Sequence, residues 1–585
     1  MKRILPIFLL ATTLFAQAPA SPESRSKSLN ALFSEMWEDN LRHNPEFASQ
    51  LGDKRFNDRL NDYSITEVNA SLLRGRQYIR RLAEFDTIGL PEQDQLSAEL
   101  MLRQLIEDQE AARFKEWEMP VNQYGGIHTD LPRLVLQLSF DTAKDYEDYI
   151  LRLGKIPTAF AQVTDNMQRG MEDGRIPPKF LLEKALVQVQ NLATQKPEDS
   201  PFALPIKKFP SSIPAAKQKE FSDAILKTIA ATVLPAYQRF ARFMAAQYVP
   251  AGRKDPGTWA IPSGDAYYAF RIRQSTTLKK SAAEIHQIGL DEVARDEAEM
   301  LVIAKKMGYA DLKTFNAALA ADPKLHPTSP QQLIDNYKHY LGAMQLKLPE
   351  LFGHLPKTPL EVVAIPDFLA VGQPEAYYEQ GTPDGSRPGR VNVNLTSFAT
   401  RTLLDNEVIS YHEGIPGHHL QISIAQELSN LPKFRGQTYF TAYTEGWALY
   451  SERLGKEVGF YTDPYNDYGR LNADTWRAIR LVIDTGVHSQ HWTRQQMYDY
   501  FRAHSASDDT NINAEIDRYI AWPAQALGYK MGQLKILELR ARAQKSLGPK
   551  FNLKVFHDLI LDSGALPMDI LERRVDAWIS SQQKT

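Results

Sequence analysis

The segment at residues 411–421 constrains the fold of this chain most, because three imidazoles, a carboxylate and a Pro-Gly pair follow one another within it. In the usual zinc-peptidase motif H-E-x-x-H, two histidines one helical turn apart bind zinc and the intervening Glu activates a water molecule. Here His412 and the Glu after it open such a motif, but Pro416 stands where the second histidine would be. The next imidazoles are those of His418 and His419. The segment therefore indicates a stretched metal-binding motif.

Pro416 and Gly417 predict a break in the helix that this motif would otherwise form. Proline has no N–H and its ring presses on the carbonyl four residues back, that of His412, while Gly417 accepts dihedral angles that other residues resist. On a straight helix His418 would lie roughly 9 Å along the axis and about 120° round from His412. A kink would swing His418 back toward His412. His419 is closer in phase but about 10.5 Å along the axis, so it ranks second as a ligand and the choice stays open.

A third metal ligand is predicted on the helical segment that contains Glu445 and Glu452. Two histidines and a carboxylate leave a fourth coordination position for water, which hydrolysis requires. Glu445 is the predicted ligand. Glu452 falls on nearly the same helix face, where it could orient a ligand imidazole. Alternatively, these carboxylates could form a solvated acidic face of the helix. The apolar residues between them disfavour this interpretation. Glu413 is the predicted general base.

Arg480, Asp484 and His488 recur at intervals of four, so they share one face of a predicted helix. Two interpretations stay open for the Asp and His of this set. They could form a local surface contact worth a few tenths of a kcal/mol. Alternatively, His488 donates a hydrogen bond to a developing oxyanion and Asp484 fixes the tautomer of its ring. Catalytic His488 is therefore a hypothesis to be tested against the structure.

Two tyrosines and an arginine follow at a junction between two helical patterns around Pro523. Tyrosine hydroxyls can stabilise a tetrahedral intermediate, and Tyr529 and Tyr519 are the candidates, for catalysis and for substrate binding respectively. Each could instead be an amphipathic core residue. Arg518 could bind a substrate carboxylate, although nothing in the sequence requires it.

Two short strands are predicted at residues 361–365 and 390–394, around Pro and Gly turns. A strand just upstream of the metal helix is where a zinc peptidase would hold an extended substrate by backbone pairing. Arg390 and Asn392 lie on this strand and are the predicted substrate-binding residues. The turn at residues 384–389 would set its position. The alternative is a plain hairpin, and the two interpretations stay open.

Most of the remaining chain has helical patterns separated by Pro or Gly breaks, which predicts a mostly α fold. Leu29, Leu32 and Phe33 follow the spacing of an amphipathic helix. Ser281 with Glu284 forms a capping box, which predicts the start of another helix.

Residues 1–18 have the features of a secretory signal peptide, because Lys2 and Arg3 precede an apolar run at residues 4–11 and small residues follow it. This run is too short for a membrane span, and no later run is long enough to cross a bilayer. We therefore predict an exported protein, periplasmic or secreted, with the signal peptide removed and no transmembrane segment.

The composition excludes several classes of site and partner. The chain has no cysteine, so disulfides, a lipid-anchored cysteine and cysteine ligands are excluded, and any zinc must be held by His and carboxylate groups. The net charge is −3 without a basic tract, which disfavours nucleic-acid binding. We predict an N-terminal helical region at residues 19–260 and a catalytic region at residues 261–585, together forming one cleft. The oligomeric state stays open.

Several motifs together resemble a bacterial family of formerly unknown function, whose exported or lipid-anchored members are regarded as zinc peptidases. The matching residues span nearly the whole mature chain; they are Thr276 and Thr277, Glu284 to His286, Gly289, Arg387 to Gly389, His412 and Glu413, Pro416 to Gln421, Glu445 to Ala448, Asp484 to Gly486, His488, Pro523, Gln525 and Ala526, and Tyr529 and Lys530. The resemblance implies a large helical gluzincin-like fold, like that of thimet-type oligopeptidases and angiotensin-converting-type carboxydipeptidases, with a small sheet beside the cleft.

Carried over from this resemblance, His412, His418 and Glu445 are expected to bind Zn²⁺, with Glu413 as the general base. The missing anchor cysteine favours a soluble exported form. The expected activity is hydrolysis of short peptides. Two alternatives stay open: a metal-dependent hydrolase of non-peptide amides or esters, and an inactive peptide-binding scaffold, which the retained Glu413 disfavours.

Overall fold

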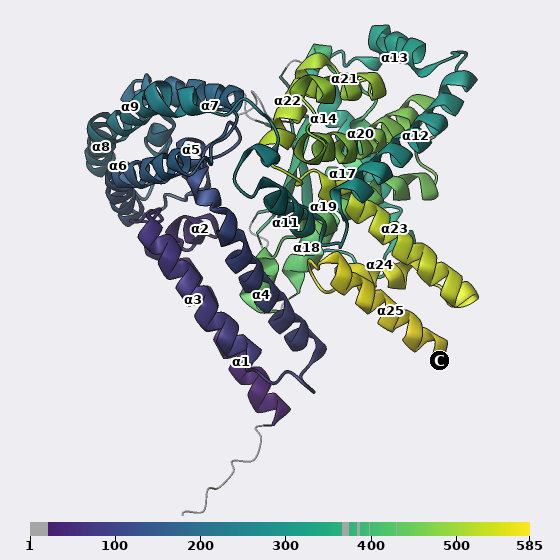
Figure 1. Ribbon diagram of the computed structural model, residues 1–585, viewed down its shortest axis with the longest axis horizontal. Helices are drawn as coiled ribbons and strands as arrows, with labels where there is room; N and C mark the ends of the chain where they lie inside the picture. Colours follow the sequence, from purple (N-terminus) through teal and green to yellow (C-terminus); the bar gives the residue numbers. More distant parts are fainter. Residues whose placement is uncertain (1–20, 366–373, 383–386, 397, 429, 585) are drawn as a thin grey trace, which may run out of the picture.

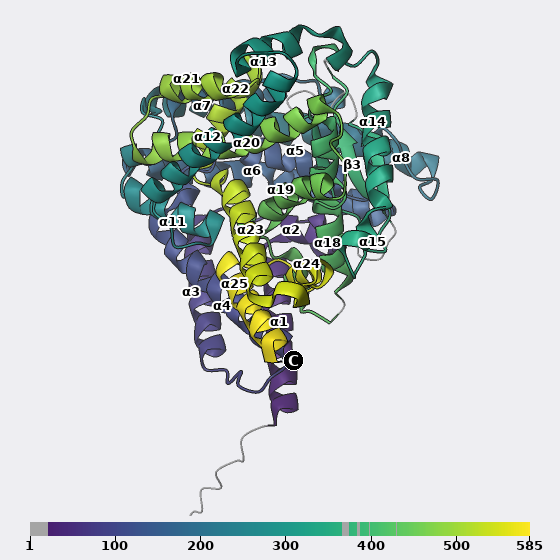
Figure 2. The ribbon, with the colours of Figure 1, turned by 90° about the vertical axis from the view of Figure 1, so that its right-hand side faces the viewer.

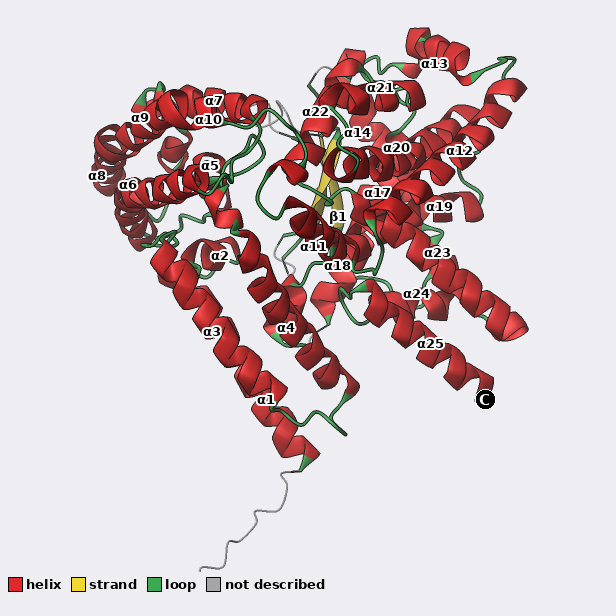
Figure 3. Cartoon of the chain, in the orientation of Figure 1, coloured by secondary structure: helices red, strands yellow, loops and turns green. Residues whose placement is uncertain are grey.

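The computed structural model describes residues 21–584 except 366–373, 383–386, 397 and 429. The predicted signal peptide and part of the predicted turn at residues 384–389 lie outside the described residues. Helices make up most of the described chain, with a three-stranded sheet among them (Figure 3). The predicted mostly α fold with a small sheet is confirmed.

The N-terminal helices form one side of the molecule (Figure 1). One hydrophobic core lies between residues 121 and 249, and includes stacked rings of Tyr146 and Phe221. The predicted amphipathic helix at Leu29 to Phe33 is α1. The helices on this side are α1 (Pro22–His43), α2 (Pro45–Gln50), α3 (Ile65–Ala83), α4 (Glu92–Ala111), α5 (Ile127–Gln137), α6 (Ala143–Glu172), α7 (Lys179–Ala193), α8 (Ala215–Thr228), α9 (Leu234–Phe243) and α10 (Val249–Ala251).

The C-terminal helices and the sheet form the other side. The largest core lies here and also receives Leu96 and Leu100 from α4, so the two sides share apolar packing. The capping box at Ser281 and Glu284 is present at the start of α12, as predicted. The helices are α11 (Gly264–Thr276), α12 (Ala282–Lys306), α13 (Leu312–Ala321), α14 (Pro330–Gln345), α15 (Leu348–Leu351), α17 (Asn406–Glu413), α18 (His418–Glu427), α19 (Thr441–Glu457), α20 (Pro464–Ser489), α21 (Arg494–His504), α22 (Asp509–Ala521), α23 (Leu527–Leu547), α24 (Leu553–Leu561) and α25 (Met568–Lys584).

The sheet lies beside α14 and α18 (Figure 2). It consists of β1 (Leu360–Ala364), β2 (Ala376–Glu379) and β3 (Gly389–Val393) in the order β1-β3-β2, with β1 parallel and β2 antiparallel to β3. The two predicted strands are confirmed as β1 and β3, each displaced by one residue, whereas β2 was not predicted.

The order of the strands corrects one expectation. Because β3 is the central strand, β1 and β2 already occupy the hydrogen-bonding groups along both of its edges. A substrate therefore cannot pair with the backbone of the predicted strand at residues 390–394, and that expectation is wrong. The edge strand that contacts α17, the helix that carries His412, is β2.

Candidate metal centre

The predicted helix break is present between α17, which ends at Glu413, and α18, which begins at His418. The N–H of Gly417 donates to the carbonyl of Tyr411 at 2.9 Å. A Cβ on Gly417 would lie 2.0 Å from the carbonyl oxygen of His412, so only glycine allows the backbone to fold back this closely. The break brings His418 back beside His412, as the Pro-Gly pair predicts.

Helix α19 packs against this break and carries the predicted third ligand. Trp447 donates its indole N–H to the carbonyl of Pro416 at 3.0 Å. On the other side of α19, a Cβ on Gly446 would lie 2.5 Å from the Cα of Gly532 in α23. The two glycines let the helices cross in close contact, and this crossing fixes the position of Glu445 next to both histidines.

The three predicted metal ligands lie together. Glu445 Oε2 is 3.6 Å from Nε2 of His412 and 3.5 Å from Nε2 of His418. One ligand atom from each residue lies within 4.8 Å of the others, and the described residues contain no other group of three His, Asp or Glu side chains this close. Two imidazole nitrogens and one carboxylate oxygen are a donor set that suits zinc with an open fourth position.

The electrostatics of this group favour a cation. Burial lowers the pKa of His412, but its hydrogen bonds to Glu445 and Glu452 outweigh this and raise the pKa to about 9. Burial raises the pKa of Glu445, but hydrogen bonds from His412 and His418 hold that pKa well below its usual value. The ionised carboxylate thus concentrates negative charge at the point where the two ring nitrogens converge.

Glu452 holds the first histidine from behind, as its place on the α19 face predicts. Its Oε1 lies 2.7 Å from Nδ1 of His412, and the Glu452 residue is 2% exposed. Since an ionised carboxylate can only accept, Nδ1 carries the proton and donates it. Nε2 is therefore the nitrogen of His412 that faces Glu445, and it would bind a metal by giving up the proton that the raised pKa keeps on this ring.

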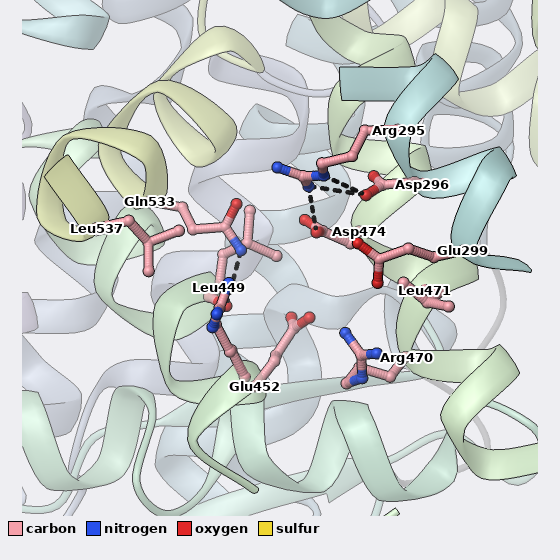
Figure 4. Close-up of a pocket in the computed structure, with 11 residues that line it drawn as sticks. Arg295, Asp296, Glu299, Leu449, Glu452, Arg470, Leu471, Asp474, Gln533 and Leu537 are labelled. Carbon is pink, nitrogen blue, oxygen red and sulfur yellow. Dashed lines mark hydrogen bonds and ion pairs between the residues drawn. The ribbon is translucent and has the colours of Figure 1, made fainter. Parts of the chain in front are cut away.

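A small cavity of about 110 Å³ opens on the other side of Glu452 (Figure 4). Figure 4 shows Arg295 across the cavity from Glu452, with Asp296 and Asp474 beside the arginine. Lys530, fully buried next to the cavity, pairs with Asp474 at 2.6 Å. Charged side chains therefore line part of the cavity that Glu452 borders.

The Glu452→Gln variant is expected to bind zinc about 10–100-fold more weakly than the wild type, because a neutral amide orients His412 without its negative charge. Competition with a chromogenic chelator measures this. Glu299→Gln is the matched control, because Glu299 lines the same cavity from α12. Equal zinc affinity of the Glu452 variant and the wild type would mean that this carboxylate does not tune the site.

The structure distinguishes the two later histidines. Nε2 of His419 donates to the carbonyl of Thr358 at 3.1 Å, and its Nδ1 accepts from the hydroxyl of Tyr378 at 3.1 Å. Burial lowers the pKa of His419 to about 4. Both ring nitrogens of His419 are therefore bound to groups of the sheet region, and His418 is the histidine that meets Glu445.

The edge strand β2 touches the predicted general base. Tyr378 donates its backbone N–H to Oε2 of Glu413 at 2.8 Å. Glu413 follows His412 directly and is half-buried. The sequence analysis missed this contact because β2 is only four residues long and has no alternation of polar and apolar residues.

Tyr439 is a second residue that the sequence analysis missed. Its hydroxyl donates to Oε1 of Glu445 at 3.1 Å, although the residue as a whole is 55% exposed. Desolvation and the nearby charges of Glu445 and Tyr529 raise the pKa of Tyr439, whereas Arg518 lowers it. It lies in the connection that precedes α19, where no helical periodicity marks it. A tyrosine hydroxyl therefore lies beside the predicted metal ligands.

His488 does not have the role that its spacing suggested. Its Nδ1 accepts from the N–H of Thr258 at 3.1 Å, its Nε2 donates to the carbonyl of Tyr519 at 3.0 Å, and it is 0% exposed. Asp484 instead accepts from the hydroxyl of Tyr268 at 2.6 Å. The hypothesis that Asp484 orients His488 for catalysis is wrong, because both ring nitrogens of His488 form hydrogen bonds with backbone groups in the core.

The two predicted tyrosines lie in one polar group with two arginines. Tyr519 is fully buried and accepts from Nε of Arg480 at 2.9 Å, so it cannot contact a substrate, which corrects the prediction. Tyr529 is half-buried, and its hydroxyl accepts from Arg518 at 3.1 Å. The guanidinium of Arg480 lies 4.5 Å from the centre of the Tyr529 ring.

Arg390 and Asn392 lie on the face of β3 that points away from α18. A Cβ on Gly389 would lie 2.6 Å from Nδ1 of His419, so Gly389 faces α18. Because side chains alternate along a strand, Arg390 and Asn392 face the opposite side. Arg390 pairs there with Glu361 of β1 at 3.4 Å. The structure does not bring either residue to the metal ligands.

The fold and the site define a large, mostly helical protein with a buried His-His-Glu group at a helix break. Residues 45–575 match the model of the family described as "Bacterial protein of unknown function (DUF885)". The chain belongs to this family. None of the curated proteins matches it significantly.

Solved structures that resemble the protein include two bacterial proteins. One is a candidate lipoprotein from Colwellia psychrerythraea, 30% identical, with a TM-score of 0.89 over 95% of this chain and 100% of that one. The other is a candidate lipoprotein of unknown function from Shewanella oneidensis, 17% identical, with a TM-score of 0.73 over 95% of this chain and 99% of that one. The second likeness concerns the fold alone. Within the described residues, no helix has the length and apolar character of a membrane span.

Proposed function

We propose that the protein is an exported zinc-dependent metallopeptidase that hydrolyses short peptides. The observation that carries this proposal is the convergence of His412, His418 and Glu445, next to a carboxylate, Glu413, that coordinates nothing in the group. A purely structural zinc site has no need of such a base, whereas hydrolysis requires one. That the protein resembles gluzincin peptidases is itself part of what we propose.

His412, His418 and Glu445 would hold the zinc ion, which when bound supplies a Lewis acid and lowers the pKa of a water molecule. Glu413 then takes a proton from the attacking water and returns it to the leaving amine. The Tyr378 N–H holds the carboxylate of Glu413 in place. The hydroxyl of Tyr439, which donates to Glu445 in this structure, is the group proposed to turn to the developing oxyanion.

A peptide substrate is favoured by the strand that borders the site. β2 is an edge strand, and among the described residues only β3 pairs with it. The backbone of such a strand can pair with an extended peptide. Since Tyr378 of β2 contacts Glu413, a peptide pairing there would pass the general base. This is the role that the sequence analysis had assigned to the wrong strand.

Export is supported by the basic and apolar start of the chain and by the candidate lipoproteins among its structural relatives. Because the chain has no cysteine to carry a lipid, we propose a soluble form.

The zinc-loaded protein should be assayed with a mixed library of short peptides beside matched non-peptide amides and esters. Mass spectrometry of the products gives the bonds cut. We expect peptide cleavage that chelation abolishes and zinc restores. Chelator-sensitive cleavage of the amides or esters alone would favour the alternative hydrolase, and binding of peptides without any cleavage would favour an inactive scaffold.

A further inference from the structure

Two arginines near the metal centre share a single carboxylate. Arg480 Nη2 lies 3.1 Å from Oε2 of Glu515, and Arg518 Nη1 lies 3.3 Å from Oε1 of the same residue. Among the described residues, neither guanidinium has another ion pair. The group therefore has one positive charge in excess. Arg480 is 5% exposed and the Arg518 side chain is 18% exposed, so water neutralises this charge poorly, and a buried charge is costly until it is paired.

The hydrogen bonds of the two arginines leave donors for an anion. Nη1 of Arg480 is buried and makes no hydrogen bond to a described residue. Nη2 of Arg518 donates to neutral acceptors, the amide oxygen of Gln525 at 2.9 Å and the hydroxyl of Tyr529 at 3.1 Å. A carboxylate satisfies a guanidinium better than these neutral acceptors do, because an Arg–carboxylate pair is often bidentate and joins opposite charges.

This group borders the metal centre. The hydroxyl of Tyr439 contacts Glu445 at 3.1 Å. On α23, Gly528 and Gly532 flank Tyr529 and pack against Thr441 and Gly446 of α19. Tyr529 and its partner Arg518 therefore lie close to the turn of α19 that carries Glu445. Tyr439 is exposed and Tyr529 is half-buried, which leaves this side of the group open to a bound molecule.

We infer that Arg518, supported by Arg480, forms a subsite that binds a carboxylate of the substrate beside the scissile bond. This inference rests on the proposed function. The planar guanidinium of Arg518 suits a two-point contact with a carboxylate, and the excess charge of the group supplies the attraction. The carboxylate can come from the C-terminus of a short peptide or from an acidic side chain.

Binding separates this inference from hydrolysis. Zinc-loaded Glu413→Gln protein is titrated calorimetrically with three versions of one short peptide: a free C-terminal acid, the C-terminal amide, and the amide with Glu in place of Gln at one position. We expect the version with the recognised carboxylate to bind at least about tenfold more tightly than the plain amide. Which version gains shows the source of the carboxylate. Equal affinity for all three versions overturns the inference, whether or not the wild type cleaves peptides.

Variants of Arg518 make the test specific. Arg518→Gln in the same background is expected to abolish the preference by weakening only the carboxylate version, and Arg518→Lys is expected to retain part of it. Arg502→Gln is the control, because Arg502 is an exposed arginine of α21 that pairs with Asp509. An undiminished preference in Arg518→Gln overturns the assignment. In the active enzyme, the same change should raise KM for the carboxylate peptide by a larger factor than KM for its amide. Failure of the wild type to cleave any peptide would count against the proposed function alone.

Discussion

Replacing Glu413 with Gln is expected to lower the rate of peptide hydrolysis by about 10²–10⁴-fold, the usual contribution of a general base, while the protein keeps its zinc. The amide has nearly the shape of the carboxylate, and its oxygen can still accept from the Tyr378 N–H that contacts Glu413 at 2.8 Å. It cannot take a proton from water. The change therefore removes the proton transfer and leaves His412, His418 and Glu445 in place.

The measurement is kcat on a cleaved peptide together with the zinc content of both proteins. Glu379→Gln is the control, because Glu379 follows Tyr378 on β2 and pairs with Arg387 rather than with the metal group. A Glu413 variant that cuts at the wild-type rate would remove the proposed base. A variant that loses zinc would place Glu413 among the ligands instead.

The His418→Ala variant is expected to lose zinc binding by more than about 100-fold, the upper range for loss of a mere supporting contact, since Nε2 of His418 faces Glu445 at 3.5 Å. His419→Ala is expected to keep zinc affinity within about tenfold. It should instead lose stability, because it removes two partly buried hydrogen bonds, to Thr358 and Tyr378, at a cost of about 1–3 kcal/mol.

Equilibrium dialysis with zinc and thermal unfolding of the metal-free proteins separate the two effects. The expected pattern is lost affinity in one variant and lowered Tm in the other. Strong zinc binding by His418→Ala together with weak binding by His419→Ala would reverse the ligand assignment.

The metal group could be predicted because its causes are local. Pro416 and Gly417 favour a helix break at this point. Glu452 follows Glu445 at i+7, which places both carboxylates on one face of α19. Glu445 lies beside His412 and His418, and Glu452, two turns further along the same face, accepts a hydrogen bond from His412. Only the choice between His418 and His419 needed the structure, because it depends on which ring the sheet covers.

The roles of His488 and the strands depended on distant packing. Periodicity places Asp484 and His488 on one face of α20, but this helix is buried on several sides. The spacing does not reveal that backbone groups of Thr258 and Tyr519 form hydrogen bonds with the His488 ring. In the same way, the sequence marks β3 as a strand but does not determine that it lies between β1 and β2. Tyr439 has no periodic context at all, so only the path of the chain brings it to Glu445.

X-ray diffraction from zinc-loaded crystals, recorded on both sides of the zinc absorption edge, tests the central claim most directly. We predict one anomalous peak about 2.0–2.2 Å from Nε2 of His412, Nε2 of His418 and a carboxylate oxygen of Glu445, the usual zinc distances for these ligands. Absence of a peak after loading at saturating zinc, or a peak at other residues, would contradict the metal centre and with it the proposed peptidase activity.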